Sequence, residues 1–232
     1  MIFLPQPTSY QDTDEILKLP ITHKEKISAL YLPNPQATLT LLYIHGNAED
    51  LGDIRPRLEQ LQQSGLNVFA YDYRGYGTSD GHPSEQNAYQ DAQQAYSYLT
   101  QTLGVRPNRL LVHGRSLGGG SAVYLAARYP VAGIILESTF TSTFRVVVPF
   151  PLLPFDKFTN LDRLKQVKVP VLVMHGEQDQ VIPIEHGRRL FEAVSGPKRS
   201  LWVAGAGHNN FPQVAGEPYF QALKEFQRLV LE

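Results

Sequence analysis

Cysteine is absent from the 232 residues of the sequence. Its absence excludes disulfide bonds, thiolate nucleophiles, zinc sites with cysteine ligands and lipid attachment to cysteine. The N-terminal residues also lack the basic region and the long apolar region of an export signal. Because both absences fit a reducing compartment, we expect a cytoplasmic protein.

An excess of charge of one sign is lacking as well. The 21 Lys and Arg residues balance 22 Asp and Glu residues, which gives a net charge of −1. Such a chain has no field that attracts phosphate backbones or anionic membranes, so nucleic acid is not an expected partner. The longest apolar run, residues 146–153, contains two prolines and is far shorter than the roughly 20 residues of a membrane-spanning helix. We expect no transmembrane segment and at most weak contact with a membrane surface.

Hydrophobic residues make up 42% of the chain, which is enough for one sizeable core, and we predict a single domain over residues 1–232. Short apolar runs, each followed by a glycine-containing turn and a helical pattern, indicate strands that are buried on both faces. They lie at residues 39–45, 67–73, 109–113, 131–136, 169–175 and 200–204. This alternation predicts an α/β fold with a mostly parallel sheet and helices on both faces.

The helices are expected between these runs. Ile54 and Leu58 lie on one face of a helix that Gly65 ends, and another helix begins after Ser84 and stops at Gly104. Further helices are predicted at residues 117–129, 185–194 and 219–231. One or two antiparallel edge strands are expected within residues 22–32, whereas the first twenty residues show no clear pattern.

A G-x-S-x-G motif, Gly114-Arg115-Ser116-Leu117-Gly118, lies where the predicted strand 109–113 meets the helix 117–129. In that context the motif forms a sharp turn, which forces the serine into a strained backbone conformation and lifts its hydroxyl above the sheet edge. Side chains in place of the two glycines would collide with the neighbouring strand or helix. A glycine-rich turn that only packs closely is the alternative, but the strand-to-helix context favours Ser116 as a nucleophile.

A serine hydroxyl needs a base to remove its proton, and the base needs a carboxylate to orient it. His208 follows the last predicted strand, and Asp179 follows the strand at residues 169–175. Both therefore lie at the carboxyl ends of strands, where open α/β sheets form their sites. We predict His208 as the base and Asp179 as the acid, although a helix cap and a surface histidine are the alternatives without chemistry. Glu137, directly after the strand 131–136, is the rival acid.

The tetrahedral intermediate of acyl transfer needs two N–H donors for its oxyanion. The backbone N–H of Leu117, at the positive end of its helix, is the first expected donor. The second is expected from the turn after the strand 39–45, with Asn47 as the first choice and Ala48 as the alternative.

His45, His113 and His175 each end a predicted strand and precede a glycine, which raises a metal site as an alternative. They share no nearby carboxylate pattern, so we expect these histidines to bond to local backbone groups. Neither a metal nor a cofactor is predicted.

The connection between Glu137 and Val169 is short, and its prolines make a continuous helix implausible. We therefore predict no large lid domain. Roughly half of its apolar side chains are expected to pack into the core. The others are expected to form an apolar wall beside Ser116 that accepts an acyl chain, and the predicted substrate contacts are Phe150, Leu153 and Phe155.

With these residues placed, the chain resembles the α/β-hydrolase superfamily over nearly its whole length. It is most similar to the lidless protein-depalmitoylase group and to the serine aminopeptidase-like (S33-type) hydrolases. The matching segments are HGNAEDLG, YDYRGYGTSDGHPSE, GRSLGG, ESTFTS, HGEQDQVIP and LWVAGAGHN. The resemblance implies a triad of Ser116, His208 and Asp179, an oxyanion hole after the first His-Gly, no cofactor, and hydrolysis of acyl esters or thioesters. It does not extend to the cysteine-rich membrane-anchoring segment of the depalmitoylases, so the resemblance does not imply depalmitoylation as the natural role.

Two other functions stay open from the sequence. The same triad also serves an exopeptidase or amidase, and the same fold also serves binding proteins without catalysis. A pure binding protein has no need of all three residues. The sequence therefore favours a serine hydrolase that acts on a small-molecule or acylated substrate.

Overall fold

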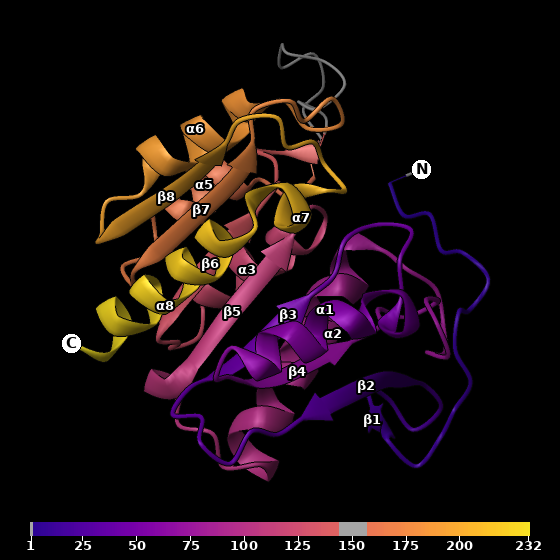
Figure 1. Ribbon diagram of the computed structural model, residues 1–232. Helices are drawn as coiled ribbons and strands as arrows, with labels where there is room; N and C mark the ends of the chain where they lie inside the picture. The colour runs from indigo at the N-terminus through magenta and orange to yellow at the C-terminus, as the bar shows by residue number, and fades with distance from the viewer. Residues whose placement is uncertain (1, 144–156) are drawn as a thin grey trace. The chain divides into compact units, whose positions relative to one another are not determined.

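The computed structural model describes residues 2–143 and 157–232 of the chain (Figure 1). They form two compact units, Met1–Val112 and His113–Glu232. The prediction of a single domain over residues 1–232 stays a prediction. The predicted substrate contacts lie outside the described residues, namely Phe150, Leu153 and Phe155.

Four strands form the sheet of the first unit, in the order β1-β2-β4-β3. They are β1 (Ile16–Pro20), β2 (Lys26–Leu32), β3 (Thr40–Ile44) and β4 (Asn67–Tyr71). β1 and β4 both pair with β2 in the antiparallel direction, whereas β3 and β4 are parallel. The expected edge strands at residues 22–32 were placed too late, because the hairpin already begins at Ile16. As an edge strand, β1 buries only Leu19.

The helices of the first unit begin at polar caps. The side chain of Asp50 accepts hydrogen bonds from two N–H groups of α1 (Leu51–Gln63), and that of Ser84 accepts one from Asn87 in α2 (Glu85–Ser97). The cap predicted at Ser84 is confirmed. α2 continues into the π-helical η1 (Tyr98–Thr102), and the 3-10 turn η2 (Pro107–Arg109) follows. The predicted stop at Gly104 is also confirmed, since its φ of 68° lies in the left-handed region that favours glycine.

The strands of the second unit follow the order β5-β6-β7-β8. They are β5 (Leu110–Arg115), whose first residues belong to the first unit, β6 (Gly133–Glu137), β7 (Val171–Gly176) and β8 (Lys198–Val203). β6 pairs with β7, and β7 with β8, in the parallel direction. β5, β6 and β7 are buried throughout, as predicted. β8 is not, because it ends the strand order and leaves two residues exposed.

Helices cover both faces of these strands. α3 (Gly118–Ala126) packs on β6, α6 (Ile184–Ala193) on β7, and α8 (Glu217–Leu231) on β8. Figure 1 shows α8 in front of the strands of this unit and α6 behind them. The five-residue helices α5 (Asn160–Leu164) and α7 (Phe211–Ala215) were not predicted, because they are too short for a helical period to be visible. Within the described ranges, no helix is both long and apolar enough to cross a membrane.

Candidate active site

Ser116 occupies the turn between β5 and α3. Its φ of 51° lies in the left-handed region, which costs an L-residue about 1–2 kcal/mol. Two neighbours hold this turn: the Ser116 N–H donates to the carbonyl of Glu137 at 2.9 Å, and the Thr139 hydroxyl donates to the Ser116 carbonyl at 2.6 Å. At Gly114 a Cβ would lie 2.5 Å from the carbonyl oxygen of Gly118. Position 114, two residues before this strained serine, thus has room only for glycine.

His208 lies in the loop between β8 and α7, against Ser116 and Asp179. Its Nδ1 is 2.8 Å from Asp179 Oδ2, and its Nε2 is 3.0 Å from Ser116 Oγ. An ionised carboxylate can only accept, so Nδ1 carries the proton of this hydrogen bond. In the neutral ring, the lone pair of Nε2 then faces the serine hydroxyl. That arrangement allows the imidazole to take the serine proton.

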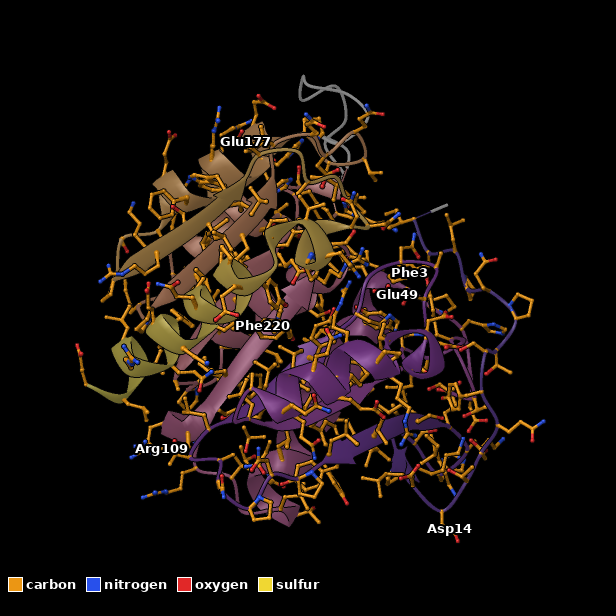
Figure 2. All side chains as sticks on the ribbon, in the orientation of Figure 1. Phe3, Asp14, Glu49, Arg109, Glu177 and Phe220 are labelled. Carbon is orange, nitrogen blue, oxygen red and sulfur yellow. The ribbon has the colours of Figure 1, made fainter. Side chains whose placement is uncertain are left out.

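Asp179 follows β7, whose carboxyl end is marked in Figure 2 by the labelled Glu177. Its Oδ1 accepts from the N–H groups of Val181 and Ile182 at 2.9 and 2.8 Å. Its Oδ2 lies 3.4 Å from Nε2 of His175 and 2.8 Å from Nδ1 of His208. Burial by itself would raise the pKa of Asp179, but the hydrogen bonds from His175, His208 and Ile182 outweigh it and hold that pKa well below its usual range. The carboxylate is therefore charged at neutral pH.

Asp179 and His208 differ in their exposure to solvent. The Asp179 side chain is fully shielded, whereas 10% of the His208 side chain is exposed. A fixed charge thus lies behind the ring, and the ring itself is open to water or to a substrate.

Glu137, the rival acid of the sequence analysis, lies elsewhere. Its fully buried carboxylate contacts His113 Nε2 at 3.0 Å and the Tyr219 hydroxyl at 3.1 Å. Both ring nitrogens of His208 have other partners, Asp179 and Ser116. Of the two candidate carboxylates, the structure brings Asp179 to the imidazole.

The strand-end histidines bond locally. His175 Nε2 donates to the carbonyl of Ile182 at 2.8 Å, and in the first unit His45 Nδ1 donates to the carbonyl of Gly46 at 2.7 Å. His113 differs, since its partner is the Glu137 carboxylate. Across residues 2–143 and 157–232 no group of three or more His, Asp or Glu side chains is placed to hold a metal ion. Sequence reasoning missed the contact of His175 with Asp179, for which only their spacing of four residues gave a signal.

The two predicted oxyanion donors lie in different units. Leu117 directly precedes α3, and among the described residues no group accepts a hydrogen bond from its N–H. In the first unit, the Ala48 N–H donates to Asn47 Oδ1 at 3.2 Å, whereas the Asn47 N–H has no acceptor in the described part of the chain. Of these two loop residues, Asn47 is therefore the one whose N–H is available to a ligand.

The N-terminal segment holds the loop of Asn47. Leu4 N–H and the Tyr76 hydroxyl donate to Asn47 Oδ1 at 2.9 and 2.6 Å, and Asn47 Nδ2 donates to the carbonyl of Ile2 at 2.7 Å. Figure 2 shows the labelled Phe3 and Glu49 in the same part of this unit. The first residues, which had no interpretable pattern, thus fix a loop that the sequence singles out.

Residues 34–155 match the family model described as serine aminopeptidase, S33. Alpha/beta hydrolase domain-containing protein 17B of Xenopus tropicalis is 43% identical over 196 residues, which are 83% of this chain and 67% of that protein. Protein 17C of Mus musculus is 40% identical over 195 residues, covering 83% of this chain and 60% of its own length.

Solved structures share the fold. An esterase from Pyrococcus furiosus superposes with a TM-score of 0.82 at 20% identity, over 100% of this chain and 98% of its own. The likeness confirms the predicted α/β-hydrolase fold. Between β6 and β7, the described residues contain no helix longer than the five residues of α5, in keeping with the absence of a large lid domain.

Proposed function

We propose, from the premise that this chain belongs to the serine aminopeptidase (S33) family of α/β hydrolases, that it hydrolyses acyl esters or thioesters through an acyl-Ser116 intermediate. The family supports hydrolysis. The observation that carries the finer proposal is the continuous contact from Ser116 Oγ through both ring nitrogens of His208 to Asp179, at 3.0 and 2.8 Å. No metal or cofactor is invoked.

In the first half of the reaction, His208 Nε2 takes the proton of Ser116 as Oγ attacks the carbonyl carbon of the substrate. The charge of Asp179 stabilises the imidazolium that forms. When the tetrahedral intermediate collapses, the bond from carbon to the leaving oxygen or sulfur breaks. His208 gives its proton to that atom, and the acyl group stays on Ser116.

In the second half, His208 removes a proton from water, and the resulting hydroxide attacks the acyl carbon. The bond to Ser116 Oγ breaks, and the proton returns from His208 to the serine. The exposed part of the imidazole is where this water approaches.

The oxyanion of both intermediates needs N–H donors. The Leu117 N–H is one proposed donor, because it lies next to Ser116 at the positive end of α3 and has no acceptor among the described residues. Asn47 as the second donor stays a prediction, supported by the free N–H within its own loop.

Two features favour acyl esters over amides. The Pyrococcus furiosus neighbour is an esterase, and the sequence 144–156 is rich in apolar residues suited to an acyl chain. The family description, serine aminopeptidase, favours the second candidate, an exopeptidase that uses the same residues.

A substrate panel tests the proposal. We would measure turnover of acyl esters and thioesters with matched chains, from acetyl to decanoyl, beside aminoacyl amides, with Ser116→Ala as the control. Turnover of esters or thioesters that the control lacks supports the proposal. Turnover of the amides alone would assign the exopeptidase function, and turnover that Ser116→Ala retains would refute the role of the serine.

A further inference from the structure

Arg115, at the first x position of the G-x-S-x-G motif, bonds to the loop of His208. It ends β5, with only 3% of its surface exposed. Its Nη2 donates to the carbonyl of His208 at 3.1 Å and to Asn209 Oδ1 at 2.9 Å. One side chain, adjacent to Ser116 in the sequence, therefore holds the main chain of His208.

Glu137 supplies the charge that a buried guanidinium needs. Arg115 Nε lies 3.7 Å from Glu137 Oε1, and the other carboxylate oxygen is held by His113 and Tyr219. A buried cation without an anion nearby is strongly destabilising. The carboxylate thus allows Arg115 to remain inside the protein and to donate to the loop.

The loop that receives these bonds contains two glycines before His208. It carries Gly205, whose φ is 79°, and Gly207, and glycine gives a backbone its largest freedom. Two further bonds hold this loop: Gln178 N–H donates to the carbonyl of Ala206, and Gly207 N–H donates to Asn210 Oδ1, which closes the loop across His208. Asp179 and Ser116 contact the ring of His208, whereas Arg115 bonds to its main-chain carbonyl.

We propose that the Arg115–Glu137 pair is a positioning device for the His208 loop. It keeps the imidazole within hydrogen-bonding distance of both Ser116 and Asp179. The inference rests on the proposed function, in which His208 transfers the proton. Because misplacement of a reacting group by about 1 Å can cost 10²-fold in rate, loss of the Arg115 bonds lowers turnover even where the fold is kept.

The test compares three variants for turnover of a p-nitrophenyl ester. Arg115→Met removes the donors but leaves Glu137 without its cation. The double variant Arg115→Met/Glu137→Gln removes both charges, so a folding defect from an unpaired carboxylate is avoided. We expect kcat to fall about 10- to 100-fold in both, with KM changed far less. Arg115→Lys restores the charge and part of the rate.

A matched control and a spectroscopic readout separate positioning from general damage. Arg188→Met makes the same substitution at a side chain that is 53% exposed and 3.9 Å from Glu177, and we expect it to keep the parent rate. The downfield proton resonance of His208 Nδ1–H, assigned by its loss in His208→Ala, is expected to broaden or disappear in the folded double variant.

A folded double variant with the parent kcat and an unchanged resonance would overturn the positioning role. If instead the parent shows no turnover that Ser116→Ala abolishes, the proposed function fails. The resonance then still decides the positioning role by itself, since its persistence in the double variant contradicts that role and its loss supports it.

Discussion

His208 with Asp179 in the second unit and His45 with Asp72 in the first are both histidine–aspartate contacts, but they differ in what the second ring nitrogen meets. His208 places Nδ1 on the carboxylate and Nε2 on a serine hydroxyl. His45 places Nδ1 on the Gly46 carbonyl and Nε2 3.3 Å from Asp72, and both side chains are fully buried. A histidine–aspartate contact thus becomes chemically useful only where the free nitrogen faces a group that can react.

The carboxyl groups of Asp72 and Asp179 also differ in the direction of their pKa shifts. Burial raises the pKa of Asp72, and the hydrogen bonds from His45 and Tyr10 offset it only in part. Burial and the neighbouring Asp72 raise the pKa of the Tyr10 phenol, which stays protonated and donates to Asp72 at 2.6 Å. Asp72 also accepts from the Leu51 N–H at 3.0 Å. It therefore joins the N-terminal segment to the start of α1, a structural task.

The largest expected effect is on Ser116 and His208. Ser116→Ala and His208→Ala should each lower ester turnover by about 10⁴-fold or more, because nucleophile and base act as one unit. Steady-state kinetics measures the effect, and circular dichroism checks the fold. A rate within about tenfold of the parent in a folded variant would show that the residue is misassigned.

The next largest effect concerns the acid. Asp179→Asn should lower kcat by about 10³- to 10⁴-fold, because the amide no longer favours the productive tautomer of His208. Glu137→Gln should keep a kcat within about tenfold of the parent, because Glu137 acts on His208 only through Arg115. Kinetics of both folded variants decides between them, and the reverse ranking would transfer the acid role to Glu137.

Asp72→Asn should lower stability rather than turnover, whereas Asp179→Asn should lower turnover. An amide at this fully buried position turns a donor toward groups that already donate, so we expect the free energy of unfolding to fall by about 2–4 kcal/mol. Urea denaturation measures the fall. An Asp72→Asn protein of parent stability that has lost its turnover would contradict the structural role of this carboxylate.

Acid should weaken the Asp179 contribution to stability. Since the folded pKa of Asp179 is depressed, its stabilisation is fully present above the unfolded pKa of about 3.9 and is lost as the pH falls through the folded value. Between about pH 5 and 2, the parent should therefore lose more free energy of unfolding than Asp179→Asn loses. Parallel pH slopes for the two proteins in urea denaturation would argue against a depressed pKa.

The smallest effect compares one left-handed non-glycine residue from each unit, Ser116 with φ 51° and Ala48 with φ 58°. Ala48→Gly relieves the strain of a Cβ but frees the unfolded chain, so we expect a gain of at most about 1 kcal/mol. Thermal unfolding should show a melting temperature higher by a few degrees at most. A clear loss of stability would mean that the Ala48 methyl group packs favourably.

Much of this arrangement could be predicted from the sequence. The buried strands and the contact of Ser116, Asp179 and His208 could be predicted, because each of these residues lies in the turn or loop that follows an apolar run. The edge strand β1 escaped prediction because one face of it meets few neighbours. The task of Arg115 could not be predicted, since its partners Glu137 and His208 lie 22 and 93 residues away along the chain, and no linear pattern connects them.

Labelling with a fluorophosphonate probe, followed by peptide mass spectrometry, tests whether the activated serine is Ser116. We predict one adduct on Ser116 in the folded parent, a labelling rate reduced at least about 10³-fold in His208→Ala, and no adduct after denaturation. A folded parent that remains unlabelled, or an adduct on another serine such as Ser121, would contradict it.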